Sequence, residues 1–284
     1  MSNPAHVLLI GLPGSGKTTF LAALWHVLEE RSSTTSLKLT GLSVDRTYLN
    51  QIAEEWRACS QVQRTNLQTE EMVVLHVDGD ELGAFDLTVP DLSGEAFEQQ
   101  LTERKTSAHH DELVQRATGV ILFVHPDVQK GTQLTQARRL EATIGGDTQE
   151  GEGADGNASA ILPWSIEKVP TQVKLIELLQ FLLERAPRKV RVAMVVSAWD
   201  LVESLGVTPH EYVSREMPML RQFLDSNSDL LEHAVFGVSA QGGSIPADKT
   251  ALLAIDALER IQVCQGDEDS HDITKPIAWL LEKR

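Results

Sequence analysis

The apolar residues of this 284-residue chain gather in short uninterrupted runs and in longer segments with a helical period. The first short run, residues 7–10, leads through a glycine-rich turn into an amphipathic segment that ends near Leu28. Apolar runs recur at 119–124, 191–196 and 234–238. Runs without polar alternation are typical of strands that are buried on both faces of a parallel sheet. These four runs therefore predict the central strands of such a sheet.

Helical patterns and one hairpin complete the predicted architecture. Segments 44–59 and 171–186 carry apolar residues at helical spacing. Two strand-like runs, 72–77 and 84–89, flank an Asp-Gly turn and predict an antiparallel hairpin. Strands that alternate with helices indicate an α/β fold. We therefore predict a doubly wound, mostly parallel sheet with one antiparallel edge hairpin, whose ligand site lies at the carboxyl ends of the strands.

We expect residues 1–284 to form a single domain with one insertion. The length allows one large domain or two modest ones. Residues 145–157 contain no apolar side chain larger than alanine, which predicts a mobile insertion at about 126–170. Residues 29–40 are polar and rich in serine and threonine, and they predict a loop.

The turn after the first strand has the chemistry of a phosphate-binding loop. The sequence from 11 to 18 satisfies the pattern G-x-x-x-x-G-K-[ST], with a strand before it and a helix after it. Glycines allow successive backbone N–H groups to cradle phosphate oxygens at the positive end of the helix. Lys17 adds charge for the β- and γ-phosphates, and the Thr18 hydroxyl is the expected Mg²⁺ ligand. The predicted phosphate-binding residues are Gly11, Gly14, Ser15, Gly16, Lys17, Thr18 and Thr19.

A second motif, D-x-x-G, follows the predicted hairpin. Asp91 begins it and Gly94 ends it. The Asp91 carboxylate can hold the Mg²⁺ shell, and the Gly94 N–H can reach a γ-phosphate. The motif is short and arises often by chance. Its position after a hairpin that itself follows a phosphate-binding loop makes it a useful signal.

Charge and cysteine content narrow the possible functions. The chain has 25 lysines and arginines against 41 acidic residues, a net charge of −16. Binding to nucleic acid or to an anionic membrane needs a basic face, so neither is expected as the main activity. Cys59 and Cys264 have no metal-ligand spacing, which favours a reduced, cytoplasmic protein. No apolar run approaches about 18 residues, so no membrane insertion is expected.

Two later strand ends resemble the base-reading elements of GTPases, N/T-K-x-D and S-A-K. These are 197–200, Ser-Ala-Trp-Asp, and 239–241, Ser-Ala-Gln. With the two phosphate motifs, they make the chain resemble the small-GTPase-like P-loop proteins of the TRAFAC class over almost its full length. The resemblance implies that Asp200 accepts hydrogen bonds from guanine N1–H and N2–H₂ and that the Ala240 N–H donates to O6. The implied base-binding residues are Trp199, Asp200, Ser239, Ala240 and Gln241.

Within that class the chain is similar to the bacterial double-GTPase group. The similarity lies in residues 11–25, 91–95, 199–200 and the tail 272–280. Members of that group are predicted to work in multi-protein systems, often linked to conflict or defence. The resemblance therefore implies a switch that binds GTP or GDP with Mg²⁺, hydrolyses GTP, and acts with an unidentified protein partner or activator.

Some residues depart from the family pattern. Ser197 and Ala198 stand where Asn or Thr and Lys are usual, which implies weaker base affinity. Glu95 stands where Ras-like enzymes have a glutamine that positions the attacking water. A glutamate can orient water or act as a base, but its charge beside a γ-phosphate is unfavourable. We therefore expect slow intrinsic hydrolysis.

The first-switch threonine that closes over Mg²⁺ must precede the hairpin. Thr65 is preferred and Thr69 is the alternative. Arg64 adjoins Thr65 and could neutralise transition-state charge. The simpler interpretation of Arg64, and the favoured one, is a solvated loop cation, because exposed charges of this kind contribute little.

Two other functions remain open from the sequence. A kinase of a small molecule or nucleotide can begin with the same loop, and Arg138–Arg139 could form its lid. That function would leave Asp200 and Ser239–Ala240 unexplained. A scaffold that holds nucleotide without turnover is the second alternative.

Overall fold

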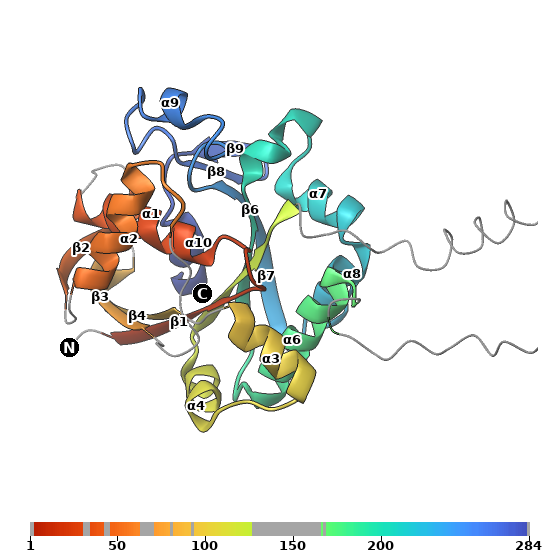
Figure 1. Cartoon of the computed structure of the whole chain (residues 1–284). Coiled ribbons are helices and arrows are strands. Elements are labelled where there is room, and N and C mark those ends of the chain that lie inside the picture. The colour runs from red at the N-terminus through yellow and green to blue at the C-terminus, as the bar shows by residue number, and fades with distance from the viewer. Residues whose placement is uncertain are drawn as a thin grey trace, which may run out of the picture.

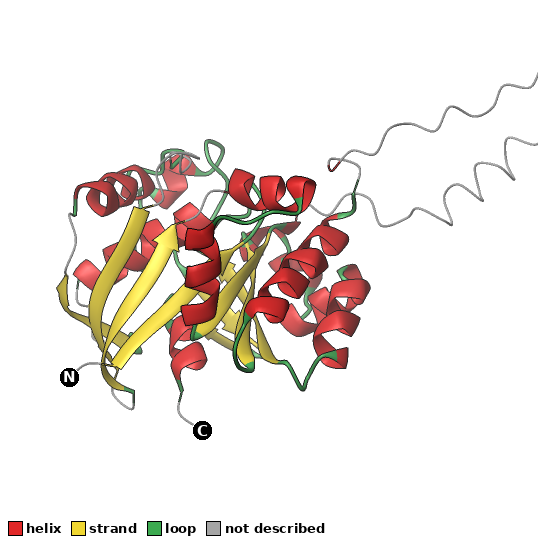
Figure 2. Ribbon diagram, turned by 90° about the horizontal axis from the view of Figure 1, so that it is seen from below, coloured by secondary structure: helices red, strands yellow, loops and turns green. Residues whose placement is uncertain are grey.

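The computed structural model describes residues 3–30, 35–42, 46–62, 71–79, 82–91, 94–126, 166 and 169–282 (Figure 1). These residues build one twisted sheet with helices on both faces, which is clear when the molecule is turned by 90° (Figure 2). The predicted insertion at about 126–170 lies almost wholly outside these residues. The mobile insertion and the single domain therefore stay predictions.

Nine strands of the described chain form the sheet, in the order β2-β3-β4-β1-β5-β6-β7-β8-β9. The five central strands run parallel to one another. They are β4 (Gly83–Asp91), β1 (Asn3–Ile10), β5 (Gly119–Val124), β6 (Val190–Ser197) and β7 (Leu231–Ser239). All six residues of β5 are buried, as its uninterrupted apolar run predicts. The predicted fold class is confirmed.

Antiparallel strands flank the parallel centre on both sides. The predicted hairpin forms from β3 (Glu71–Gly79) and β4, which pair along their whole length. Outside it lies β2 (Leu37–Leu42), which pairs with β3 where the sequence predicted the end of a loop. The far edge carries β8 (Gln262–Gln265) and β9 (Glu268–Ser270). The loop prediction for 29–40 is wrong at its end, because β2 begins at Leu37 and pairs with β3, and Leu37 is fully buried.

The two faces of the sheet carry separate apolar cores. Alternate residues of a strand point to opposite faces, so Val7 and Leu9 of β1 join one core while Leu8 and Ile10 join the other. The first core is covered by α1 (Lys17–Glu29), α2 (Thr47–Arg57) and α10 (Lys275–Leu281). The second core is covered by α3 (Gly94–Glu103), α4 (Ala108–Arg116), α6 (Thr171–Arg185), α7 (Pro209–Glu216) and α8 (Pro218–Ser226).

The tail that resembles the double-GTPase group has a structural role. Asp272 is buried, and one of its oxygens accepts hydrogen bonds from the N–H and hydroxyl of Ser36, each at 2.7 Å. The other oxygen accepts from the N–H of Thr274 at 2.9 Å and from its hydroxyl at 2.6 Å. The Thr274 hydroxyl oxygen also accepts from the Leu37 N–H at 3.2 Å. The tail therefore fastens the start of β2 to the start of α10.

None of the helices in the described ranges has the length and apolar character needed to cross a bilayer. This finding agrees with the apolar runs of the sequence, which are all short.

Candidate nucleotide-binding site

A cleft of about 690 Å³ opens at the carboxyl ends of the parallel strands, a size that suits a small-molecule ligand. Its walls come from the loop after β1, the first turn of α1, and the ends of β5, β6 and β7. The start of α3 and residues 60–62, which follow α2, complete the wall. In α/β sheets, ligands bind at this edge. The motifs predicted from separate strand ends are therefore brought to one cleft.

The loop 11–16 has the conformation that a phosphate cradle requires. Gly14 and Gly16 have φ angles of 72° and 90°, which side-chain-bearing residues rarely adopt. A Cβ on Gly11 would lie 2.5 Å from the Ser15 Oγ and 3.1 Å from the Phe123 carbonyl oxygen, so a larger residue there would displace its neighbours. Helix α1 begins at Lys17 and directs its N-terminus at the cleft, which favours an anion. Thr18 and Thr19 line the cleft in the same turn.

Lys17 lies across its own loop. Its side chain is 6% exposed, and Nζ donates to the Gly11 carbonyl at 2.7 Å and to the Leu12 carbonyl at 3.3 Å. The ammonium also lies 5.7 Å from the centre of the Phe97 ring of α3. These contacts hold the charge beside the cradle, where a phosphate oxygen can accept from it.

The two segments that resemble base-reading elements are joined to each other. The buried Ser239 hydroxyl at the end of β7 donates to the Asp200 carboxylate, and its oxygen accepts from the Gly242 N–H at 3.1 Å. The Ser197 hydroxyl donates to the Val124 carbonyl at 3.2 Å and so links the ends of β6 and β5. Asp200, Ser239, Ala240 and Gln241 all line the cleft. The predicted elements therefore form one wall of the cleft, and Ser197 in this wall lies beside Gly16 of the phosphate-binding loop.

Trp199 does not have the position that the resemblance implied. Its side chain is 4% exposed and packs edge-on against Tyr212 of α7, with ring centres 5.8 Å apart. It is not among the residues that line the cleft. A Cβ on Gly237 of β7 would come within 2.4 Å of the indole, so this glycine makes room for the ring. Trp199 anchors the turn beneath Asp200 and is buried away from the cleft. Ala198, in the left-handed region with φ 47°, makes this turn possible.

The switch residues are described only in part. Glu95 lines the cleft from the first turn of α3, and Gly94 is the first residue of that helix. The Asp91 backbone ends β4, while its side chain lies outside what the structure describes. Arg64, Thr65 and Thr69 fall in the range 63–70, which lies outside the described residues. Arg138–Arg139, the lid of the kinase alternative, also lie outside them. Residues 60–62 line the cleft, so the chain approaches the predicted first switch along the cleft wall.

Several residues that line the cleft were not predicted as site residues, and His125 is the titratable one among them. His125 follows β5 directly and lines the cleft. Its sequence signal is a titratable residue immediately after the buried apolar run 119–124, at a strand end where an α/β fold places its ligand site.

Thr18 fits the expected Mg²⁺ site. Mg²⁺ is commonly held by one or two protein oxygens, with phosphate and water oxygens completing its shell. A threonine hydroxyl in the cleft, next to the cradle, is a donor of that kind. No cluster of three or more His, Cys, Asp or Glu side chains that could hold a metal occurs among the residues that the structure describes. A site completed by the nucleotide's own phosphates needs no such cluster.

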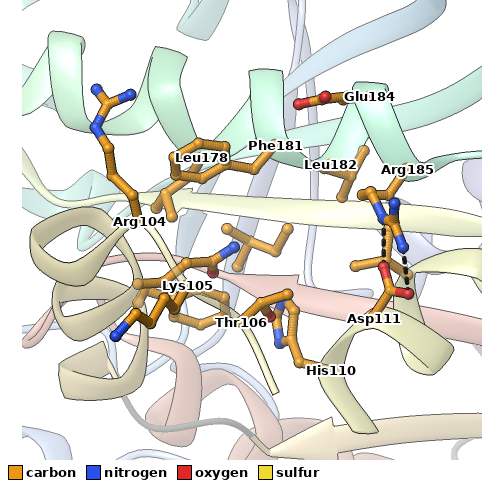
Figure 3. A pocket seen from close by; sticks show the side chains of 14 residues that line it. Arg104, Lys105, Thr106, His110, Asp111, Leu178, Phe181, Leu182, Glu184 and Arg185 are labelled. Atoms are coloured by element: carbon orange, nitrogen blue, oxygen red, sulfur yellow. Dashed lines mark hydrogen bonds and ion pairs between the residues drawn. The ribbon is translucent and has the colours of Figure 1, made fainter. Parts of the chain in front are cut away.

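A second, smaller cavity of about 120 Å³ lies between α3, α4 and α6 (Figure 3). Apolar side chains line its interior, and charged side chains surround its mouth. There the Arg185 guanidinium donates to both Asp111 oxygens, at 2.5 and 2.6 Å, and these bonds hold the pKa of that carboxyl below its usual value. Phe97 lines this cavity and also contacts Lys17. A residue of the cavity wall and a residue of the cleft wall are therefore neighbours.

The fold and the cleft define a small-GTPase-like P-loop protein. The chain belongs to the Double-GTPase 1 family, whose model matches residues 8–280. A search of curated proteins finds no match. Among solved structures, the chain is similar to one titled signal recognition particle receptor SRb-GTP/SRX complex from Chaetomium thermophilum. The two are 16% identical with a TM-score of 0.46, and the match covers 89% of this chain and 98% of the other.

Proposed function

We propose that this protein binds GTP with Mg²⁺ and hydrolyses it to GDP and phosphate, and that another protein reads the two states. The observation that carries the proposal is the joined wall of Asp200 and Ser239 in the same cleft as the phosphate-binding loop. A protein that bound only a phosphate group would not need this wall. Membership of the Double-GTPase 1 family supports guanine as the base.

The phosphates would be bound by groups of the first loop. The backbone N–H groups of 14–19 and the N-terminus of α1 supply positive potential, and Lys17 supplies a full charge. Thr18, with Thr65 and Asp91 as further candidates, would hold Mg²⁺, which when bound neutralises charge on the β- and γ-phosphates. The Gly94 N–H would donate to a γ-phosphate oxygen.

Hydrolysis depends on positioning and electrostatics, because water is the nucleophile and the protein forms no covalent bond. We propose that the Glu95 carboxylate accepts a hydrogen bond from the attacking water and so orients it. The negative charge of Glu95 beside the γ-phosphate opposes the reaction unless a cation is near. Arg64 or an activating protein could supply that cation, so intrinsic turnover should be slow.

The setting that the resemblance implies, a bacterial multi-protein system in the cytoplasm, belongs to the same proposal, as does a single domain spanning 1–284.

The two alternative functions, a kinase and a nucleotide-binding scaffold, differ from a GTPase in the phosphate that they release. A kinase would consume GTP or ATP only when an acceptor is added, and a scaffold would release no phosphate at all. Phosphate release without any acceptor supports the GTPase proposal, and its absence with every candidate activator contradicts it.

Asp200→Asn is expected to exchange GTP for XTP as the preferred nucleotide. A carboxylate accepts from both N1–H and N2–H₂ of guanine, whereas the asparagine amide replaces one acceptor with a donor. Xanthine carries a carbonyl where guanine carries its amino group, so the asparagine NH₂ group can donate a hydrogen bond to it. Each unpaired polar group in a closed site costs about 1–3 kcal/mol, so GTP affinity should fall about a hundredfold. The measurement is titration of each nucleotide against wild type and variant.

Asp229→Asn is the matched control, because Asp229 is exposed in the turn before β7, at the opposite end of that strand from Ser239. It should leave both affinities unchanged. By the same argument, wild type should prefer GTP over ATP by about a hundredfold. Equal binding of ATP and GTP by wild type, or no gain of XTP binding by Asp200→Asn, would mean that 197–200 is only a strand end.

The first switch should respond to the γ-phosphate. If Thr65 joins the Mg²⁺ shell only when GTP is bound, the amides of residues 60–70 should exchange more slowly with a GTP analogue than with GDP. Hydrogen exchange with mass spectrometry measures this, and β5, which is buried and paired on both sides, serves as the internal reference. Identical exchange in the two states would eliminate Thr65 and point to Thr69 or to a static binding module.

A further inference from the structure

The last turn of α2 is bonded to the loop that would read the base. Trp56 is completely buried, and its indole Nε1 donates to the Ala240 carbonyl at 2.9 Å. In the opposite direction, the Gln241 side-chain amide donates to the Trp56 carbonyl at 3.4 Å. A peptide group is planar, so a bond that holds the Ala240 oxygen also fixes the direction of the Gln241 N–H. Trp56 therefore sets the orientation of a peptide that lines the cleft.

A buried arginine supports the contact between Trp56 and the loop 239–241. Arg260 is 3% exposed, and its guanidinium stacks 4.7 Å from the centre of the Trp56 ring. Its Nη1 lies 2.6 Å from the Cys59 sulfur, and its Nη2 donates to the Arg57 carbonyl at 3.5 Å. The guanidinium thus contacts both the ring of Trp56 and the chain that follows it. This fixes the indole plane, and with it the direction of the Nε1–H bond.

The same turn leads directly into the predicted first switch. Cys59 ends the helical path with φ 46°, and Ser60 then donates its N–H to the Glu55 carbonyl at 2.9 Å. Residues 60–62 line the cleft, and 63–70 follow them. The base-reading loop and the start of the switch segment are therefore fastened to one helical turn.

We propose that Trp56 is a positioning residue for guanine recognition, and that through the last turn of α2 it couples base binding to residues 57–62, which precede the predicted first switch. This rests on the proposed function, because it assumes that 239–241 contacts a guanine base. The proposal adds a connection between the base and the start of the switch that consists of the last turn of α2 and does not involve the phosphate-binding residues. Ordering of the loop by the base would then restrict the first residues of the switch even with GDP bound.

The simplest other role for Trp56 is to fill the core, and the test must separate the two roles. Trp56→Phe keeps a buried aromatic ring and removes the Nε1–H donor. We expect GTP affinity to fall about tenfold, since one hydrogen bond that orients the loop is lost, and ATP affinity to change less than about twofold. The ratio of the two affinities should therefore fall. A residue that only fills the core would lower the unfolding temperature and leave this ratio unchanged.

Trp25→Phe is the matched control. Trp25 is also completely buried in the same core, and its Nε1 donates to Asn50 at 3.0 Å, away from the base-reading loop. It should lower the unfolding temperature by a similar amount without changing the ratio of GTP to ATP affinity. A second measurement is hydrogen exchange of residues 57–62, which GDP should slow in wild type and in Trp25→Phe but not in Trp56→Phe.

The outcomes distinguish this inference from the proposed function. A lower affinity ratio in Trp56→Phe alone, with loss of GDP protection at 57–62, supports the coupling. If wild type prefers GTP but Trp56→Phe keeps both the ratio and the protection, the coupling is wrong and the proposed function stands. If wild type has no preference for GTP over ATP, the proposed function fails and the coupling fails with it.

Discussion

Lys17→Ala is expected to lower the affinity for GTP by a hundredfold or more and to leave the fold intact. The ammonium is held beside the phosphate cradle by the Gly11 and Leu12 carbonyls, and Lys17 is the one lysine or arginine among the described residues that line the cleft. Hydrogen bonds to charged groups contribute about 1.5–3 kcal/mol each, and a phosphate chain can accept more than one from a lysine. Losing them corresponds to a hundredfold or more in affinity.

The fold should survive this change because Lys17 belongs to neither apolar core. The Gly11 and Leu12 carbonyls lose this donor, but Lys17 itself lines the cleft, so the space that its side chain leaves can admit water. Titration of GTP and thermal unfolding of the nucleotide-free protein are the measurements. Lys189→Ala is the control, because the exposed Lys189 donates to Ser228 at the other end of the sheet. A GTP affinity within about threefold of wild type, roughly 0.7 kcal/mol, would contradict the phosphate-binding assignment.

Asp272→Ala is expected to destabilise the protein by about 3–5 kcal/mol, since truncation of a buried hydrogen-bonded charge leaves its partners unpaired. Asp272 accepts four hydrogen bonds, two from Ser36 and two from Thr274, and Thr274 is completely buried. The hydroxyl groups can turn toward other acceptors, but the two backbone N–H groups cannot. Chemical denaturation measures the change as a shift of the unfolding midpoint.

The control compares this buried carboxylate with an exposed one. Asp225 forms an ion pair with Arg221 at 2.8 Å, and its side chain is 47% exposed. Pairs of this kind contribute about 1 kcal/mol or less, so Asp225→Ala should have a small effect. The stability loss of Asp272→Asn should lie between those of Asp225→Ala and Asp272→Ala. Asparagine keeps one acceptor oxygen, but its NH₂ group faces the two donors that the other carboxylate oxygen accepts from. If Asp272→Ala costs no more than Asp225→Ala, the tail does not fasten β2 to α10.

The central sheet and the phosphate-binding loop could be predicted because their signals lie in contiguous residues. A run such as 119–124 has no polar face, so it has to be buried on both sides. The loop 11–18 combines residues that need unusual backbone angles with residues that bind phosphate, all within one turn. The φ angles of Gly14 and Gly16 agree with that requirement.

Weaker local signals were the ones that failed. The strand β2 was predicted as the end of a loop, because only Leu37 and Leu39 alternate, a β-bulge follows them, and the preceding segment is polar. Helices α3 and α4 were not predicted, since only a few apolar residues on each, among them Phe97 and Leu113, face the core. For Thr65, Arg64 and Asp91, the roles in metal binding and catalysis stay predictions.

The sequence by itself determined the class of fold, the end of the sheet at which the site forms, and the chemistry of the first loop, because each depends on neighbouring residues. The tertiary structure alone decided how separate strand ends meet. It turned Trp199 into the core while Asp200 faces the cleft, and it joined Trp56 to Ala240 across 184 positions of the chain. Such contacts follow from the packing of whole elements against one another. No spacing along the sequence encodes that packing, so these partners could be found only in the folded molecule.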